Sequence, residues 1–324
     1  MKKKSLGLIL SVAAVMVLAA CGQVSNAPVE TPTQTAVETA TEAGLTGVIK
    51  VFTRDATSGT REAFEGIVGF KDKLTNDAFE VSSNGDMAKK VGSEKSGIGY
   101  VSLTTDLEAD NLIAVSYEGV EPTVETVIDG SYKLARPFSY TTRAKGDFES
   151  ADKEALVAAF IDYMANSVEG REVVLGSGGI VNVDEGTPWE ELKKNHPIVD
   201  KDNSGLTLAT AGSTSVEKTL KAALESFIPL AGNFKINMNQ TGSGDGFKRV
   251  LGTEKDGANK ADIGFASRDF KTEEDVKGAL ASGIYCKDAV VVVVNGENKG
   301  VANLSQAQVA SIFEGQTKNW EDIK

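Results

Sequence analysis

The chain has 324 residues, 41% of them hydrophobic and 25% charged, and this composition excludes wholesale disorder. Its 46 acidic and 34 basic residues give a formal charge of −12, so we expect no basic surface for nucleic acid. Two cysteines, Cys21 and Cys286, and one histidine, His196, argue against a disulfide framework, a zinc site and a Ser-His-Asp triad. The length suits roughly two lobes of about 150 residues each.

Residues 1–21 have the pattern of a signal peptide. Three lysines at 2–4 precede an apolar run over 6–20, which is too short for a mature membrane span. The run ends in Leu-Ala-Ala-Cys-Gly at 18–22, which resembles the lipobox of bacterial lipoproteins. The resemblance implies that Cys21 becomes the lipid-bearing first residue of the mature chain.

Residues 22–45 have the composition of a flexible tether. The segment holds five threonines, two prolines and three glutamates, with no aromatic and no basic residue. It cannot bury enough apolar surface to fold alone. The sequence therefore predicts a folded body that is anchored by lipid on the outside of the cytoplasmic membrane.

The remaining chain contains one pattern twice. An alternating strand at 48–52 leads into a loop of hydroxyl residues and glycine at 54–60 and then into a helix at 61–68. A second strand ends in the loop 211–215, which is followed by a helix at 216–227. Each loop therefore opens a helix, and the two copies lie about half the chain apart.

Two further pairs of segments extend the repeat. Residues 82–91 parallel residues 242–250, since each is a turn that leads into a short helix. Downstream, the apolar strands 97–101 and 262–266 share an Ile-Gly pair. Repeats of this length predict two similar α/β lobes rather than a solenoid.

Other segments carry local signals. Residues 289–294 form a continuous apolar run, which is typical of a strand buried on both faces. Capping boxes are expected at Thr214 with Glu217 and at Ser305 with Gln308, each opening a helix.

Two residue types that often carry chemistry have ordinary interpretations here. The polar stretch 193–205 is expected to be a surface connection, with His196 as a solvated loop residue rather than a catalyst. Cys286 is expected to be a small buried hydrophobe, because no second histidine or cysteine is available to activate its thiol.

The two hydroxyl-rich loops predict anion binding. The first turn of a helix has unsatisfied N–H groups and a partial positive charge, and glycine lets the backbone approach a ligand closely. Arg54 adds one fixed positive charge, with a planar fork that suits an oxyanion. If the lobes face each other, the loops form one site that holds an anion mainly by neutral donors.

Enzyme motifs are missing. Gly252 and Gly257 have the spacing of a P-loop but are followed by Ala-Asn, and residues 242–244 do not supply a G-x-S-x-G elbow. We therefore expect no phosphoryl transfer and no ester hydrolysis. The protein is expected to be a non-enzyme that needs no cofactor and no metal.

At these residues the chain resembles the phosphate-binding lipoproteins of the phosphate-specific (Pst) ABC transporter, which belong to the type II periplasmic binding protein superfamily. The similar segments are 54–64, 212–216, 242–244 and 262–268, and the resemblance covers nearly all of residues 46–324. It implies an α/β fold with two lobes, a ligand cleft between them and hinge closure. The phosphate-binding residues that it implies are Arg54, Ser58, Gly59, Thr60, Thr214, Ser215, Ser243 and Ser267.

The order of the segments departs from the family. The segment similar to 206–324 comes first in the family and the one similar to 48–183 second, so we infer a circular permutation. The implied lobes are 46–132 plus 288–324 and, as one uninterrupted stretch, 133–287, with hinges near Tyr132 and Lys287. A fragment of a longer tandem chain is the rival interpretation.

The resemblance implies a monomeric receptor that captures inorganic phosphate and delivers it to the permease of an ABC transporter. Some family members have an aspartate where this chain has Arg268, so the acceptor of the phosphate proton is open, with Asp55 and Asp245 as substitutes. A receptor for sulfate or molybdate, a surface or sensor lipoprotein without a transport role, and an extracellular phosphatase are the alternatives.

Overall fold

The computed structural model describes residues 45–323. The predicted signal peptide, its Cys21 and residues 22–44 of the predicted tether lie outside this range. Leu45, the last residue of the predicted tether, is partly buried and packs against the folded body. Within the described residues no helix is both long and apolar enough to cross a membrane.

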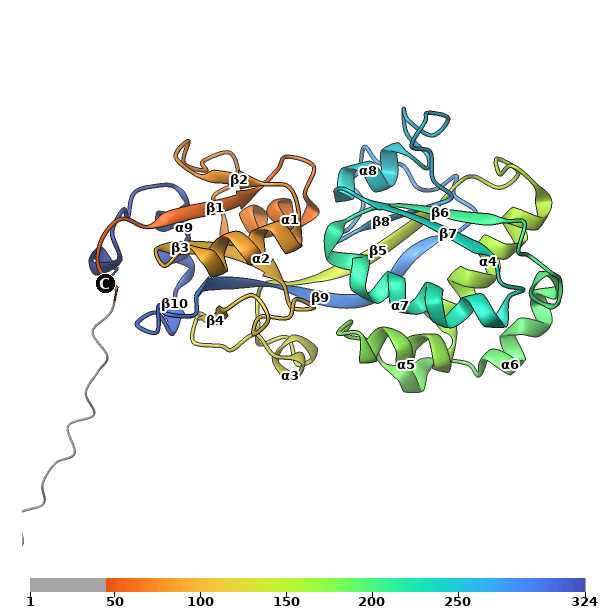
Figure 1. Ribbon diagram of the computed structural model, residues 1–324, viewed down its shortest axis with the longest axis horizontal. Helices are drawn as coiled ribbons and strands as arrows, with labels where there is room; N and C mark the ends of the chain where they lie inside the picture. The colour runs from red at the N-terminus through yellow and green to blue at the C-terminus, as the bar shows by residue number, and fades with distance from the viewer. Residues whose placement is uncertain (1–44, 324) are drawn as a thin grey trace, which may run out of the picture. The chain divides into compact units, whose positions relative to one another are not determined.

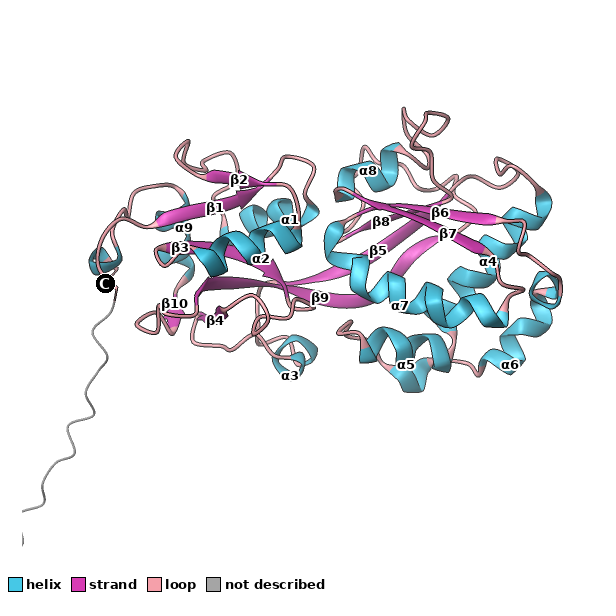
Figure 2. Ribbon diagram, in the orientation of Figure 1, coloured by secondary structure: helices cyan, strands magenta, loops and turns pink. Residues whose placement is uncertain are grey.

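The body alternates strands and helices (Figure 1 and Figure 2). The strands are β1 (Lys50–Arg54), β2 (Phe79–Val81), β3 (Gly97–Ser102), β4 (Leu112–Tyr117), β5 (Ala135–Thr142), β6 (Thr207–Gly212), β7 (Lys235–Gln240), β8 (Ile263–Ala266), β9 (Ser282–Asn295) and β10 (Asn303–Leu304). The α-helices are α1 (Gly59–Val68), α2 (Asn84–Ser93), α3 (Val124–Ile128), α4 (Ala151–Asn166), α5 (Val168–Gly176), α6 (Trp189–Leu192), α7 (Glu217–Phe227), α8 (Ser243–Lys248) and α9 (Gln306–Phe313). The 3-10 turns are η1 (Val183–Glu185), η2 (Lys193–Asn195), η3 (Pro197–Asp200), η4 (Thr214–Val216), η5 (Ile228–Leu230) and η6 (Trp320–Asp322).

The predicted repeat is present in the strand order. β1 pairs in parallel with β2 on one side and with β3 on the other. β6 likewise pairs in parallel with β7 and β8. Each half of the body thus has a parallel three-stranded unit in which the first strand lies in the middle. Because the carboxyl ends of parallel strands meet at one edge, the loops after β1 and β6 start from equivalent places.

Two long antiparallel strands join the halves. β9 pairs with β3 and β4 through its second part and with β5 through its first part. β5 also pairs with β8, so the path across the sheet runs β2-β1-β3-β9-β5-β8-β6-β7. The pairing of β5 with β9 shifts register between Phe138 and Ser139. Figure 1 shows β5 and β9 running from one half of the body into the other.

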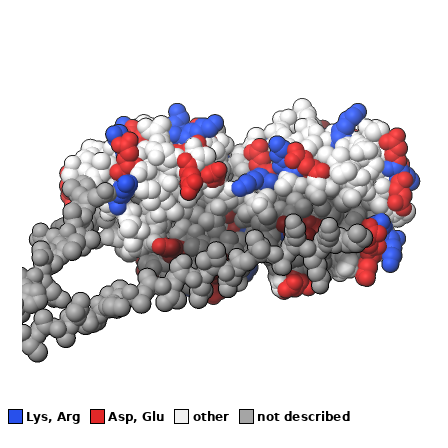
Figure 3. Space-filling model, turned by 60° about the horizontal axis from the view of Figure 1, so that its bottom comes forward, with Lys and Arg blue, Asp and Glu red and all other residues white. Residues whose placement is uncertain are grey.

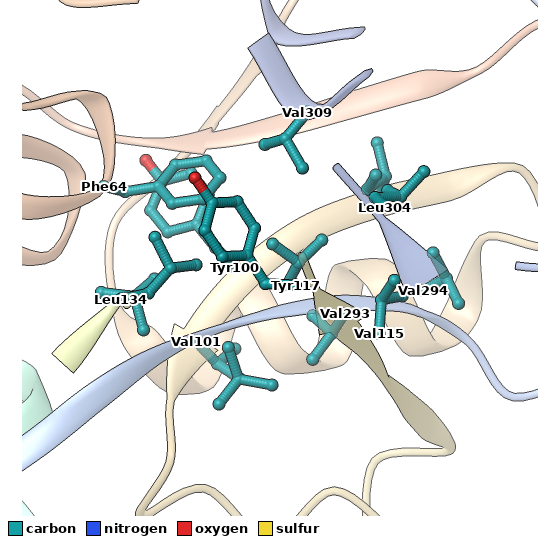
Figure 4. Close-up of a cluster of buried hydrophobic side chains, with 14 of the residues drawn as sticks. Phe64, Tyr100, Val101, Val115, Tyr117, Leu134, Val293, Val294, Leu304 and Val309 are labelled. Atoms are coloured by element: carbon teal, nitrogen blue, oxygen red, sulfur yellow. The ribbon is translucent and has the colours of Figure 1, made fainter. Parts of the chain in front are cut away.

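Buried apolar side chains form two main clusters. The first core packs α1, α2 and α9 around β1, β3, β4 and the second part of β9; the second core packs α4, α5 and α7 around β5, β6 and β8. In the first core the ring of Phe64 stacks on that of Tyr100 with centroids 4.4 Å apart (Figure 4). The ring of Phe64 also meets that of Phe313 edge to face at 5.0 Å. Leu134 and Ile180 also belong to the first core, and the predicted lobe boundaries at 132 and 288 stay a prediction.

The local signals had mixed outcomes. The capping box at Ser305 and Gln308 is confirmed at the start of α9. Cys286 is 3% exposed and its thiol is free, and burial raises its pKa well above the ordinary value, as expected of a buried hydrophobe. Val290 to Val294 are each at most 1% exposed, in agreement with a strand buried on both faces.

The interpretation of His196 as a solvated loop residue is wrong. Its ring lies 2.8 Å from Asp162 through Nε2 and stacks on Trp189 with centroids 6.1 Å apart. The stretch around it forms η2 and η3, and it buries Ile198 and Val199 against the second core. The polar composition of residues 193–205 gave no sign that Ile198 and Val199 are buried, or that His196 contacts Asp162 on α4.

The contact between His196 and Asp162 predicts a pH dependence of stability. The hydrogen bond from His196 lowers the pKa of Asp162 below its ordinary 3.8. A carboxyl group whose pKa is lower in the folded state stabilises the fold above its unfolded pKa and loses that contribution as the pH falls through the folded value. We expect Asp162→Asn to reduce the free energy of unfolding at pH 7 and to approach the wild type only as the pH falls below 3.8, through the lowered pKa of Asp162. Urea titrations at neutral pH and at acid pH, below that pKa, measure this.

A matched control for that comparison is Asp152→Asn, which removes the carboxylate of an exposed pair with Lys201. Exposed pairs contribute about 0–1 kcal/mol, so this variant is expected to follow the wild type at both pH values. Equal effects of the two substitutions at pH 7 would contradict a specific role of Asp162.

The ends of the described chain lie side by side. The N–H of Trp320 donates to the carbonyl of Gly47 at 3.0 Å, and Val48 forms an antiparallel bridge with Asn319. Adjacent ends are what a circular permutation requires, because the same chain can then be cut and joined elsewhere without moving its elements. The permutation itself stays a prediction.

Candidate functional site

The candidate site lies where β1 and β6 end. Arg54 is the last residue of β1, and α1 begins five residues later at Gly59. Gly212 is the last residue of β6, and η4 begins at Thr214. The predicted strand-loop-helix pattern therefore places both loops at equivalent strand ends, one in each half of the body.

The Arg54 side chain lies inside this site and is 1% exposed. Its Nη2 donates to the carbonyl of Ser82 at 3.1 Å and to Asp55 Oδ2 at 3.2 Å. Its Nη1 donates to Thr214 Oγ1 in the other half at 3.2 Å. Its Nε has no partner within the described residues, although a buried N–H normally has one. A buried guanidinium with a spare donor is suited to an incoming oxyanion.

The backbone of Arg54 is fixed by two neighbours. Its N–H donates to Tyr100 Oη at 3.0 Å, and its carbonyl accepts from Arg61 Nη1 at 2.9 Å. Arg61 is in turn paired with Glu65 at 2.7 Å. Burial raises the pKa of Tyr100 to about 12, so its hydroxyl stays protonated. The side chain of Arg54 thus starts from a rigid point at the carboxyl end of β1.

Most of the predicted hydroxyl groups meet in one buried row. Thr60 Oγ1 lies 2.9 Å from Ser215 Oγ, and this contact joins the two halves. Ser267 Oγ lies 3.3 Å from Ser243 Oγ and accepts from Ser213 Oγ at 2.9 Å. The residues that carry these hydroxyls are between 0% and 2% exposed. Because bulk water does not reach them, each hydroxyl needs a hydrogen-bond partner from the protein or from a ligand.

The start of α1 supplies backbone donors. Ser58 caps this ten-residue helix, and its Oγ accepts from the N–H of Arg61 at 3.2 Å. In the described part of the chain the N–H groups of Gly59 and Thr60 have no hydrogen-bond partner. These two N–H groups, the hydroxyl row and the guanidinium of Arg54 together form one set of hydrogen-bond donors.

The two halves touch at Gly59. A Cβ atom at this position would lie 2.1 Å from Ser243 Oγ and 2.6 Å from Ser243 Cβ, closer than real atoms approach. Beside it, the N–H of Gly244 donates to the carbonyl of Thr57 at 3.2 Å. Glycine at 59 is therefore required by close approach, since only hydrogen fits between α1 and α8.

The capping box predicted at Thr214 and Glu217 is wrong. Thr214 Oγ1 accepts from Arg54 Nη1 and from the N–H of Asn84, both at 3.2 Å and both in the other half. The capping role passes to Ser213, whose Oγ accepts from the N–H of Ser215. A pattern of nearby residues could not reveal that this hydroxyl faces across the site.

The sequence analysis missed an ion pair beside the hydroxyl row. Arg136 on β5 is 4% exposed and Asp288 on β9 is 0% exposed, and Arg136 Nη2 lies 2.7 Å from Asp288 Oδ2. Nη2 also donates to Ser215 Oγ at 3.1 Å, and Nη1 donates to Ser267 Oγ at 3.3 Å. The sequence offered one signal, since Arg136 and Asp288 each stand beside an apolar strand segment. A charged residue that is buried with such a strand needs a partner of opposite charge.

The carboxylates considered as proton acceptors are already engaged. Asp55 accepts from the N–H of Thr57 at 2.9 Å and from Arg54, while Asp245 pairs with Arg249 at 3.1 Å. Arg268, which stands where some family members have an aspartate, pairs with Glu274 at 2.7 Å. Asp55, Asp245 and Arg268 thus all have partners within the protein.

A cavity of about 390 Å³ adjoins the site. Its walls carry hydroxyl, amide, acidic and lysine side chains from both halves, namely Ser83, Asn84, Thr104, Thr105, Asp106, Thr214, Ser215, Glu217, Lys218 and Lys221. On the face that Figure 3 presents, acidic and basic side chains are interspersed rather than gathered by sign.

Residues 45–323 contain no cluster of three or more histidine, cysteine, aspartate or glutamate residues that could hold a metal ion.

Comparison with known proteins identifies the family. A family model described as a PBP superfamily domain matches residues 25–168 and 196–324. The chain belongs to the PBP superfamily. Phosphate-binding protein PstS 2 of Streptococcus agalactiae is 32% identical over 286 residues, which cover 86% of this chain and 88% of that protein. Phosphate-binding protein PstS 2 of Streptococcus pneumoniae is 31% identical over 294 residues, 88% of this chain and 91% of that protein.

A solved structure has the same fold. The phosphate-binding protein of a phosphate ABC transporter from Streptococcus pneumoniae superposes with a TM-score of 0.60 at 29% identity, covering 86% of this chain and all of that chain. The expected two-lobed α/β fold of this superfamily is thereby confirmed. These relatives are named as binding proteins and not as enzymes, which agrees with the expectation of a non-enzyme.

The exchange of the two halves relative to the family stays a prediction.

Proposed function

We propose that this protein is a receptor for inorganic phosphate and delivers it to the permease of an ABC transporter. The relatives that match along most of this chain are phosphate-binding proteins, and the solved relative belongs to a phosphate ABC transporter. The residues proposed to bind phosphate are Arg54, Ser58, Gly59, Thr60, Thr214, Ser215, Ser243 and Ser267.

The buried guanidinium of Arg54 carries this proposal. Hydrogen-bond donors are supplied by its spare Nε, by the unpartnered N–H groups of Gly59 and Thr60, and by the hydroxyl row, which spans both halves. An oxyanion offers several acceptors in a compact tetrahedron and would satisfy these donors together. Charge-assisted hydrogen bonds to buried donors are the stronger ones, so a small anion can be held without a large basic surface.

Binding is proposed to close the two lobes about the hinge strands. In this proposal the lobes are 46–132 plus 288–324 and 133–287, and β5 and β9 bend near Tyr132 and Lys287. The contacts of Thr60 with Ser215 and of Thr57 with Gly244 join the halves. In this proposal they break when the site opens. An anion that contacts both halves would favour this closed arrangement by its differential affinity for it.

The proposed setting is the outer face of the cytoplasmic membrane. Lipid on Cys21 would anchor the chain, residues 22–45 would act as a tether, and the receptor would work as a monomer. The permease is the proposed protein partner.

A receptor for another tetrahedral oxyanion is the second candidate. A free carboxylate would reject sulfate, because sulfate has no proton to donate to it. Asp55 and Asp245 are instead bonded to protein groups, which is the observation that favours this alternative.

Isothermal titration of the purified chain separates the two candidates. After bound anion has been removed, phosphate is titrated at neutral pH, first alone and then in excess sulfate. The proposal predicts 1:1 binding of phosphate that sulfate does not weaken. Competition by sulfate would favour the second candidate, and no heat with either anion would contradict both.

A further inference from the structure

The strands that join the halves carry a buried charge pair next to the proposed site. Arg136 and Asp288 are direct partners in the register of β5 and β9. Arg136 Nε and Nη2 donate to Asp288 Oδ2 at 2.9 and 2.7 Å. The pair lies on the proposed hinge strands, while most of the other proposed donors lie at the starts of helices.

The pair also contacts both halves. The guanidinium of Arg136 donates to Ser215 and Ser267, which belong to the hydroxyl row of the second half. Asp288 Oδ1 accepts from Ser102 Oγ in the first half at 2.9 Å. Among the described residues, the hydrogen bonds of the Arg136 guanidinium outside the pair all go to hydroxyls proposed to bind the anion.

Two arginines approach the hydroxyl row, and each faces a carboxylate: Arg54 contacts Asp55 and Arg136 contacts Asp288. Burial lowers the pKa of Arg136, Asp288 opposes this shift, and the positive charge of Arg54 adds to it. An anion bound beside Ser215 and Ser267 would add a favourable interaction with the Arg136 guanidinium.

We infer that Arg136 is a second anion-binding arginine, whose Nη1 and Nη2 donate to the ligand from the hinge while Asp288 holds the guanidinium in place. The inference rests on the proposed function and extends it. Ligand oxygens would replace Ser215 and Ser267 as acceptors of the two N–H groups.

The test separates charge from packing by changing the pair in two ways. Asp288→Asn keeps the arginine but removes its counter-charge, so phosphate affinity should stay equal or increase even if the fold is less stable. Arg136→Gln with Asp288→Asn removes both charges from the interior, so stability should be retained while phosphate affinity falls about 10-fold or more. Titration calorimetry gives the affinities and urea unfolding without phosphate gives the stabilities.

Two further variants keep the comparison decisive. Arg143→Gln removes a buried arginine outside the site and should leave phosphate affinity unchanged. If the double variant does not fold, Arg136→Lys replaces it. The phosphate affinity of this variant should fall by more than its loss of stability explains, because lysine lacks the planar fork.

Three outcomes would overturn the inference. The first is wild-type affinity in the folded double variant. The second is a loss of affinity in Asp288→Asn as large as the loss in the double variant. The third is wild-type affinity in Arg136→Lys, when that variant is the one measured. A wild-type chain that binds no phosphate would be a different result, because it would overturn the proposed function as well.

Discussion

Replacing Arg54 by alanine is expected to weaken phosphate binding about 150-fold, the upper end of the roughly 1.5–3 kcal/mol that a charge-assisted hydrogen bond contributes. The upper end applies because Arg54 is 1% exposed and its Nε has no partner among the described residues. Water cannot replace the lost donors at such a buried place. Calorimetric titration of the variant measures the change.

Two controls accompany Arg54→Ala. Arg54→Lys keeps the charge without the fork and should lie between the wild type and the alanine variant. Arg171→Ala removes an arginine on α5 that donates to the carbonyls of Ala165 and Asn182, and it should leave the affinity unchanged. An unchanged affinity of Arg54→Ala, in a chain that urea unfolding shows to be folded, would remove Arg54 from the site.

Gly59→Ala is expected to weaken phosphate binding about 100-fold, because overpacking a tight contact costs about 1–3 kcal/mol. The added Cβ would lie 2.6 Å from Ser243 Cβ, which is fixed at the start of α8. The new methyl group would hold the two halves apart in the closed arrangement. Calorimetry on the same batch of protein compares the variant with the wild type.

Gly66→Ala is the matched control on the same helix. Gly66 is exposed on α1, and a Cβ atom there would meet nothing within 4 Å. Alanine should therefore stabilise α1 by about 1 kcal/mol through helix propensity and leave phosphate affinity unchanged. Equal affinities of the two alanine variants would mean that the approach of Gly59 to Ser243 plays no part in binding.

Much of the fold follows from patterns along the chain. The repeated strand, hydroxyl-rich loop and helix predicted two equivalent units, and the parallel neighbours of β1 and β6 have that arrangement. The loops around Arg54 and Ser213 could be placed because parallel strands bring their carboxyl ends to one edge.

The parts that could not be predicted depend on contacts between distant segments. Arg136 and Asp288 are 152 residues apart, and only the register of β5 with β9 makes them partners. Thr214 has the spacing of a helix cap, yet its hydroxyl accepts from Arg54 across the site. His196 has polar neighbours in the sequence, while its partners Asp162 and Trp189 come from packing of the second core.

A crystal structure of the chain grown with phosphate tests the central claim most directly. We predict one phosphate between the halves, with its oxygens within hydrogen-bond distance of the Arg54 guanidinium, the N–H groups of Gly59 and Thr60, and the hydroxyl of Ser215. A phosphate bound anywhere else, with this site closed on itself and empty, would contradict the claim.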